Sequence, residues 1–501
     1  MANKTKFQAI KGTRDLLPPE TELWNRVEQT AREVFGTFGF GEIRLPIFEP
    51  TELFARSIGL DTDIVGKEMF TFPDPPLLFN PQFVAGWTKL KELAIAYDPG
   101  IGSINQESQE LILANSRKWA LAAFTGMKWA IESSMADPVT LRPEATASVC
   151  RAYIEHGMQA LAQPVKLYYM GPMFRRARPQ KGRYRQFYQI GAEALEAITP
   201  NQDASKSPGK DAAVDAEVIE MVMVYFARLG LEGVQLDINS IGHSAPECRR
   251  GYVEKLKAAL EKVKDKLGED SKRRIDTNPL RVLDSKLESE QGIIEKLPRI
   301  GDHLCADCAK HYAEVKRQLE LRGVAYRENW RLVRGLDYYM RTTFEITARG
   351  LGSQNAVCGG GRYDGLVELL GGPPTKGIGF AIGEDRVILS LQEAGKVDMA
   401  QGLDVYIAWM GEKTLATAIR AARDLRQAGL RVELPPVEQK FGKALGQADK
   451  LGARYALILG EDEVASGQWT LKTLADGTQG KYSEAGLLEF LRRQRGEKVK
   501  E

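Results

Sequence analysis

Apolar residues recur along this chain at helical spacing in some segments and at strand spacing in others. Near the N-terminus they predict an amphipathic helix that ends between residues 36 and 41, with a strand following at 42–48. A second helix is predicted at 211–229 by one apolar face. The positions that carry the first pattern are Leu23, Trp24, Val27, Ala31, Val34, Phe35 and Phe38.

Residues 171–193, GPMFRRARPQKGRYRQFYQIGAE, predict two facing strands joined by a basic loop. Because side chains alternate between the faces of a strand, Gln189 and Glu193 share one face and Ile190 lies on the other. The apolar run 168–174 supplies the first strand, and Pro179, Lys181 and Gly182 form the turn. Six basic residues surround this turn, which favours binding of a polyanion: Arg175, Arg176, Arg178, Lys181, Arg183 and Arg185.

Further strands and one long interruption follow from the same patterns. Residues 61–72 and 138–144 predict neighbouring strands, and the segment 75–137 between them predicts a helical hairpin inserted into a turn. Such an insertion costs little entropy and needs no function, although contact with a nucleic acid or a partner is the alternative. Strands return in 331–346, 356–372 and 377–389.

Two further regions have a composition of their own. Residues 240–327 are strongly charged and almost wholly helical in pattern, which indicates a separate lobe. After a linker at 391–402, the pattern alternates strand and helix and predicts an α/β module of parallel-sheet type over 402–496. Its elements are predicted at 405–409, 414–428, 431–434, 440–451 and 455–459.

Composition limits the class of protein more than its function. The 501 residues suffice for two to four domains and a large core, and the formal net charge is only +2. A nucleic-acid partner must therefore meet a local basic surface. The N-terminus lacks an apolar signal core and no window is apolar enough to span a membrane, so we expect a cytoplasmic protein. Five scattered cysteines are expected to be reduced.

One cysteine pair raises the question of a metal. Cys305, Cys308 and His311 form a CysXXCysXXHis cluster, with Cys248 and His303 as further candidate ligands. The spacing fits zinc, but a second CysXXCys pair is missing. We therefore expect no metal site and inert buried thiols, with zinc as the alternative.

The segment 171–193 resembles the second signature motif of class II aminoacyl-tRNA synthetases, and its ArgProGln and LysGlyArgTyrArgGln elements resemble the histidyl-tRNA synthetase family. The lead 9–19 and Pro46 in the strand 42–48 are similar to that family's opening and first motif. The resemblance implies an α+β catalytic domain with a mostly antiparallel sheet flanked by helices, built from residues 1–239 and 328–392. It also implies a helical insertion domain at 240–327 and an anticodon-binding α/β domain at 402–496.

The resemblance implies ATP-dependent activation of L-histidine to histidyl-adenylate and transfer of the histidyl group to tRNA(His). It also implies Mg²⁺ brought with ATP, and a homodimer formed through the first motif. Arg175 and Arg386 match the arginines that hold ATP, and Arg334 in ArgGlyLeuAspTyrTyr matches one that contacts the histidine carboxylate and the α-phosphate. The residues that match the family's histidine contacts, besides Arg334, are Glu144, Thr146, Gln189, Glu193, Tyr338 and Tyr339.

The glycines Gly359, Gly360 and Gly361 are expected to let the backbone approach the ligand closely. Two residues depart from the family pattern. Ala177 stands where the second motif usually has a glutamate that helps to hold ATP or the tRNA acceptor end, and Ala145 replaces a usual glycine. These departures keep a second hypothesis open, a non-catalytic paralogue that binds histidine and regulates another enzyme.

Overall fold

The computed structural model describes residues 7–59, 62, 64–73, 138–180, 182–198, 209–351, 355–395 and 402–494. The chain divides into two compact units, Met1–Asp15 with Arg26–Lys396, and Leu16–Asn25 with Val397–Glu501. The insertion predicted at 75–137 and the turn residue Lys181 lie outside the described residues. Among the described helices, none has the length and apolarity that crossing a membrane requires.

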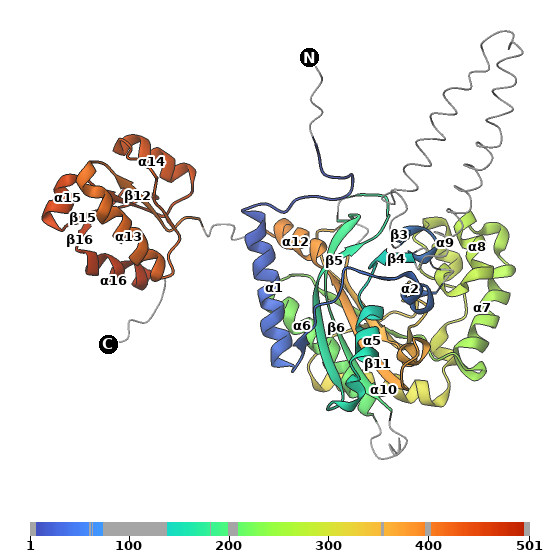
Figure 1. The fold of residues 1–501 in the computed structure, drawn as a ribbon. Coiled ribbons are helices and arrows are strands. Elements are labelled where there is room, and N and C mark those ends of the chain that lie inside the picture. Colours follow the sequence, from blue (N-terminus) through green and yellow to red (C-terminus); the bar gives the residue numbers. More distant parts are fainter. Residues whose placement is uncertain are drawn as a thin grey trace, which may run out of the picture. The chain divides into compact units, whose positions relative to one another are not determined.

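The first unit is built on an eight-stranded sheet in the order β1-β5-β6-β11-β10-β9-β7-β8 (Figure 1). Its six inner strands are antiparallel, and β1 and β8 join the two edges in parallel. The prediction of a mostly antiparallel sheet is confirmed. The strands are β1 (Gly41–Glu42), β5 (Val165–Phe174), β6 (Gln186–Ala197), β7 (Gln235–Ser240), β8 (Arg327–Glu328), β9 (Met340–Thr347), β10 (Ala356–Arg362) and β11 (Thr375–Gly383).

Helices cover both faces of this sheet. Tyr168 and Tyr169 are consecutive on β5 and point to opposite faces. The Tyr168 ring lies 5.7 Å from Phe35 of α1 (Glu20–Thr37), and Phe35 also contacts Tyr225 of α6 (Lys210–Leu229). Tyr169 packs instead in the core formed with α5 (Thr146–Glu155). The ligand-facing side chains described below lie on the α5 side.

A small second sheet corrects one strand prediction. The predicted strand 42–48 is divided between β1 of the large sheet and β2 (Phe48–Pro50), which belongs to a three-stranded sheet in the order β2-β4-β3. Pro46 lies in the interruption and has no N–H to donate to a ladder. The other strands are β4 (Pro138–Leu141) and β3 (Phe70–Pro73), and residues 64–68 before β3 form a helical turn rather than a strand.

The remaining helices of this unit are shorter. One of them, α12, begins directly where β11 ends, and its first turn borders the cavity described below. The bounds are α2 (Thr51–Ile58), η1 (Ile64–Glu68), η3 (Met158–Ala160), α11 (Leu366–Leu369) and α12 (Glu384–Glu393).

The helical lobe has its own core, formed by buried residues such as Leu256, Ile275 and Ile294, and Tyr339 belongs to the same cluster. Figure 1 shows α7, α8 and α9 gathered at one side of the sheet. The lobe consists of η5 (Pro246–Arg250), α7 (Gly251–Glu261), η6 (Lys264–Lys266), α8 (Glu269–Thr277), η7 (Pro279–Val282), α9 (Glu288–Ile294), η8 (Ile300–His303) and α10 (Ala306–Leu321). The predicted limits 240–327 stay a prediction.

The C-terminal module has a five-stranded sheet in the order β13-β12-β14-β15-β16. Its first three strands are parallel as predicted, whereas β15 and β16 are antiparallel additions that the sequence pattern did not reveal. The elements are β12 (Val405–Trp409), η9 (Glu412–Thr414), α13 (Leu415–Gln427), β13 (Val432–Glu433), α14 (Phe441–Lys450), β14 (Tyr455–Leu459), α15 (Glu461–Ser466), β15 (Trp469–Thr473), β16 (Gln479–Tyr482) and α16 (Glu484–Gln494).

Candidate active site

A cavity of about 320 Å³ opens on the α5 side of the large sheet. Its walls come from β5, β6, β10, the start of α12 and the segment before β9, so residues far apart in sequence meet there. Eight of the nine predicted site residues line it: Glu144, Thr146, Arg175, Gln189, Arg334, Tyr338, Tyr339 and Arg386. The cavity therefore joins the three predicted arginines to the predicted histidine contacts.

Glu144 forms an acidic corner of the cavity at the N-terminus of α5. Its two carboxylate oxygens accept the backbone N–H groups of Thr146 at 2.7 Å and Ala147 at 3.0 Å. Burial raises the pKa of this carboxyl, and these two hydrogen bonds and the charge of Arg175 partly oppose the increase. A cationic group of a ligand would stabilise the ionised carboxylate here.

Glu193 is the predicted contact that, among the described residues, does not line the cavity. It lies behind Thr146, whose hydroxyl donates to Glu193 Oε1 at 2.7 Å, and Tyr363 donates to Oε2 at 2.5 Å. The pKa of Glu193 is raised to about 8, chiefly by burial and also by the negative charge of Glu144, against the two hydrogen bonds. Glu193 thus orients the Thr146 hydroxyl from a position outside the cavity.

Arg175 and Arg386 occupy the basic side of the cavity. Arg175 donates from Nε to the Pro143 carbonyl at 2.9 Å, and its guanidinium lies 5.2 Å from the centre of the Phe187 ring. Arg386 donates from Nη1 to the Ala356 carbonyl at 2.7 Å. Burial lowers the pKa of both groups, but a guanidinium remains charged at neutral pH. Both arginines are therefore held as fixed positive charges.

Arg334 is held by a partner that sequence reasoning missed. Its Nη1 lies 3.3 Å from Glu345 Oε2, and its guanidinium carbon lies 5.8 Å from the centre of the Tyr339 ring. Glu345 itself lines the cavity from β9. Its position inside the strand 331–346 was visible in the sequence, but no motif distinguished it from a solvent-facing acid.

The glycines of β10 leave room for neighbouring side chains as well as for a ligand. A Cβ atom added to Gly359 would lie 2.2 Å from Arg334 Nη1 and Nη2. The absence of a side chain at Gly359 therefore leaves room for the Arg334 guanidinium to lie directly over β10. The expectation that these glycines let the backbone approach a ligand stays a prediction, and at Gly359 the arginine fills the space that a side chain would take.

Two polar atoms of predicted site residues in the cavity remain available to a ligand. Gln189 Oε1 and Arg334 Nε are buried and find no hydrogen-bond partner among the described residues. An unsatisfied buried polar atom costs free energy, of the order of 1–3 kcal/mol. Both atoms belong to predicted site residues, which suits a polar ligand bound between them.

The N-terminal lead packs onto the basic hairpin. Arg185 donates its backbone N–H to the Gly12 carbonyl at 2.7 Å, and Arg14 lies 3.2 Å from Asp385 at the start of α12. Asp385 also accepts the Tyr188 backbone N–H at 3.0 Å. The lead, the hairpin and α12 therefore support one another beside Arg386.

Ala177 also lines the cavity and is buried. The position at which the motif resemblance predicts a glutamate therefore falls inside the candidate site. A carboxylate at this position would lie on the same basic hairpin as Arg175 and Arg183.

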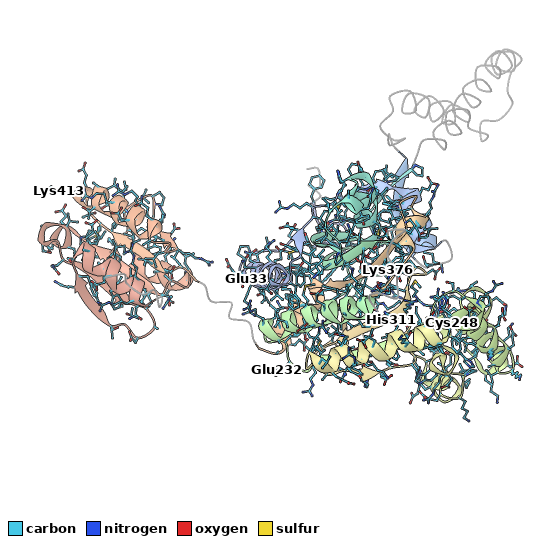
Figure 2. All side chains as sticks on the ribbon, turned by 90° about the horizontal axis from the view of Figure 1, so that it is seen from below. Glu33, Glu232, Cys248, His311, Lys376 and Lys413 are labelled. Atoms are coloured by element: carbon cyan, nitrogen blue, oxygen red, sulfur yellow. The ribbon has the colours of Figure 1, made fainter. Side chains whose placement is uncertain are left out.

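The predicted cysteine and histidine cluster needs a correction. His311 does not join Cys305 and Cys308, because its side chain is buried against α6, with Nε2 3.3 Å from Asp215 Oδ2. The histidine that joins these cysteines is His243, which sequence reasoning missed. Cys248, a candidate from the sequence, belongs to the same cluster. Figure 2 labels His311 and Cys248, which belong to two different helical elements, α10 and η5. His303 lies elsewhere, 3.3 Å from Lys255 Nζ.

Comparisons with known proteins agree with this geometry. The family model described as histidyl-tRNA synthetase matches residues 131–387, and the model described as anticodon binding domain matches residues 404–494. Proteins named histidine–tRNA ligase from Koribacter versatilis (strain Ellin345) and Solibacter usitatus (strain Ellin6076) are each 47% identical to this chain. The alignments cover 97% and 94% of this chain, respectively, and 96% of each relative.

A solved structure extends the agreement to three dimensions. The crystal structure of apo S. aureus histidyl-tRNA synthetase is 32% identical in sequence, with a TM-score of 0.68, and the match covers 97% of this chain and 100% of that one. The resemblance carried by the hairpin motif is thereby confirmed over almost the whole length. This chain belongs to the histidyl-tRNA synthetase family.

Proposed function

We propose that this protein is a histidine–tRNA ligase. It activates L-histidine with ATP to histidyl-adenylate and pyrophosphate, and then transfers the histidyl group to the 3′ end of tRNA(His). The observation that carries the proposal is the single cavity in which Arg175, Arg334 and Arg386 face Glu144 and Tyr339. The names of the relatives that are 47% identical support the same activity.

In the first half-reaction, a carboxylate oxygen of histidine attacks the α-phosphorus of ATP and pyrophosphate leaves. The negative charge that develops on the phosphate oxygens needs fixed positive donors. Arg175 and Arg334 supply them at the α-phosphate, and Arg386 holds the rest of the triphosphate. Because neighbouring backbone and side chains already hold these guanidinium groups, little reorganisation is needed when ATP binds.

Histidine is recognised by charge and by hydrogen bonding. Glu144 and Gln189 receive the α-ammonium group, since a buried carboxylate favours a cationic partner. Tyr339, with Tyr338 beside it, faces the imidazole ring, and Thr146 stands with the groups around the α-amino end. Glu193 acts through Thr146, because it accepts that residue's hydroxyl hydrogen. A side chain without ring nitrogens would leave these groups unpaired.

Mg²⁺ accompanies ATP and neutralises part of the phosphate charge. Carboxylate oxygens are the protein ligands that Mg²⁺ prefers, and Glu345 places one in the cavity wall. When ATP is bound, Glu345 would hold the ion beside Arg334.

In the second half-reaction, a terminal ribose hydroxyl of tRNA attacks the carbonyl carbon of the adenylate and AMP leaves. The hairpin that carries Arg175 also exposes Arg176, Arg178 and Arg183 next to the cavity. These side chains suit the phosphates of the acceptor end. The C-terminal module matches the anticodon binding domain family, and in this proposal it binds the anticodon of the tRNA.

The protein works in the cytoplasm as a homodimer formed through the segment around β2. Ile47 and Phe48 expose 46% and 58% of their surface there, although both are large and apolar. An exposed apolar pair in the region of the first motif suits a contact with the same region of a second copy.

The alternative is a histidine-binding regulatory paralogue. Fold alone does not separate the two, because a structure described as an ATP phosphoribosyltransferase regulatory subunit/histidyl-tRNA synthetase from Bacillus halodurans C has a TM-score of 0.55 at 18% identity. Arg334 and the C-terminal module, which regulatory paralogues tend to lack, favour the ligase.

Histidine-dependent exchange of pyrophosphate into ATP tests the proposal with purified protein. We expect robust exchange for the wild type and a loss of about 100-fold or more for Arg334→Gln, because one transition-state charge contact is worth about 3 kcal/mol or more. Arg299→Gln, in the lobe, is the control and should retain full exchange. Histidine binding without any exchange would identify the regulatory paralogue instead.

A further inference from the structure

Four side chains of metal-ligating type meet at the base of the helical lobe. They are His243, in the loop after β7, Cys248 in η5, and Cys305 and Cys308 at the start of α10. One ligand atom from each lies within 4.8 Å of every other. We propose that these four residues bind a structural zinc ion through the three thiolates and His243 Nδ1.

The distances fit tetrahedral coordination. Zinc–sulfur bonds of about 2.3 Å and zinc–nitrogen bonds of about 2.0–2.1 Å place neighbouring ligand atoms roughly 3.5–3.8 Å apart. His243 Nδ1 lies 3.2 Å from Cys308 Sγ and 3.8 Å from Cys305 Sγ. Shifts of less than about 0.5 Å in these two distances would satisfy the geometry of the ion.

The backbone around the four ligands brings the sulfur atoms together. Cys305 is the N-cap of α10, and the Cys308 N–H lies 3.5 Å from Cys305 Sγ, which suits a thiolate at a helix start. Gly242 has φ +62°, and a Cβ atom there would lie 2.6 Å from Cys248 Sγ. A residue without a side chain is therefore needed for the loop to pass the thiol.

The imidazole is oriented for this role. With Nδ1 directed at the sulfur atoms, Nε2 is left on the other side of the ring, 3.9 Å from Glu247 Oε1. Histidines that ligate metals usually direct their second nitrogen to a carboxylate, which fixes the ring and its tautomer. Cys248 and Cys308 are 1% and 0% exposed, whereas His243 and Cys305 are partly exposed, so the fold would cover the ion on the side of these two thiols.

The other cysteines show the contrast. Cys150 and Cys358 are buried singly in the sheet unit and belong to no metal-ligating group among the described residues. A single buried thiol behaves as a small apolar side chain. Three thiols around one imidazole are a different arrangement, because soft thiolate and imidazole ligands favour zinc.

The position of the site gives the ion a structural task. The ion would connect the segment that follows β7, at the start of the lobe, with the first turn of α10, near its end. This connection between the two ends of the lobe is called the clamp below. Arg249, next to Cys248, donates to the Tyr339 carbonyl at 2.6 Å, and Arg341 donates its N–H to the Gly242 carbonyl at 2.7 Å. The clamp is therefore tied to the strand that begins beside the cavity.

Metal analysis of the full-length protein, purified under reducing conditions from zinc-supplemented cells, tests this inference without any assay of activity. We expect about one zinc ion per chain. Replacement of zinc by cobalt should give the thiolate-to-cobalt charge-transfer bands and the intense d–d bands of a tetrahedral site. Less than about a tenth of an ion per chain, together with no thiolate bands on cobalt addition, would overturn the proposal.

Variants identify the ligands. Cys248→Ser and Cys308→Ser should each lose most of the zinc, whereas His243→Cys should keep it and shift the cobalt spectrum toward that of four thiolates. Cys150→Ala and His303→Ala, outside the cluster, are the matched controls and should keep the wild-type stoichiometry. Retention of zinc at the wild-type level and affinity in both serine variants would contradict the assignment, because each removes one of the four ligands.

Discussion

Gly359 lies directly against the guanidinium of Arg334, so that a Cβ atom on Gly359 would lie 2.2 Å from both terminal nitrogens. Because Gly359 has no side chain, the Arg334 guanidinium can lie over β10, with its Nη1 3.3 Å from Glu345 Oε2. The position of this arginine thus depends on a residue that contributes no side-chain chemistry of its own.

Gly359→Ala should therefore displace Arg334 without removing its charge. We expect pyrophosphate exchange to fall by about 100-fold, because a displacement of 1 Å in a reacting group can cost that much. Gly446→Ala is the control, since a Cβ atom there meets nothing within 4 Å and its exchange should be unchanged. Equal activity in both variants would show that Arg334 tolerates displacement.

Glu193 makes the stability of the protein depend on pH. Its pKa is raised to about 8 by burial, so the folded protein holds a proton there that the unfolded chain releases at lower pH. The protein therefore binds more protons folded than unfolded between the ordinary carboxyl pKa and about 8, and stability from this group is lost as the pH rises through that window. At about 1.4 kcal/mol per pKa unit, the loss amounts to several kcal/mol.

Glu193→Gln removes this dependence, because the amide does not titrate. Between pH 5 and pH 9, we expect the melting temperature of the wild type to fall more steeply than that of the variant. Glu254→Gln, an exposed position on α7, should follow the wild type. Parallel curves for the wild type and Glu193→Gln would show that Glu193 titrates normally.

Ala177→Glu introduces the residue that the motif resemblance predicts at this position of the cavity. A carboxylate on the same hairpin as Arg175 and Arg183 should order their side chains and lower the KM for ATP or tRNA by about threefold to tenfold, an effect of about 1 kcal/mol. Steady-state aminoacylation measures both constants. Ala177→Gln is the matched control for size, and the same KM values in it as in Ala177→Glu would exclude an effect of charge.

Phe48→Asp should separate the dimer. Phe48 exposes 58% of its surface beside Ile47, and a charge at the centre of an apolar contact is costly to bury. Light scattering after size exclusion should give the monomer mass for this variant and twice that mass for the wild type. Leu161→Asp, with the same 58% exposure elsewhere, should remain dimeric. A dimeric Phe48→Asp protein would place the interface at another surface.

The sequence by itself determined the helices and strands with strong hydrophobic periodicity. It also identified the candidate site residues that lie within highly specific sequence motifs. The helix predicted at 211–229 is α6, and the hairpin 171–193 is the β5–β6 pair with Gln189 facing the cavity. Local periodicity was enough here because each element has to bury its own apolar face. The motif arginines were found for a similar reason, since Arg175 and Arg334 stand in sequence patterns of high specificity.

Only the tertiary structure decided which side chains meet. His243 joins Cys305 across the whole helical lobe while the nearer His311 turns to Asp215, and Glu345 pairs with Arg334 across a strand. These contacts depend on how the lobe packs onto the sheet and on register between strands, which no local pattern encodes. Sequence spacing determines on which face of a helix or strand a residue lies. The distances between residues on different elements are set only when those elements pack together.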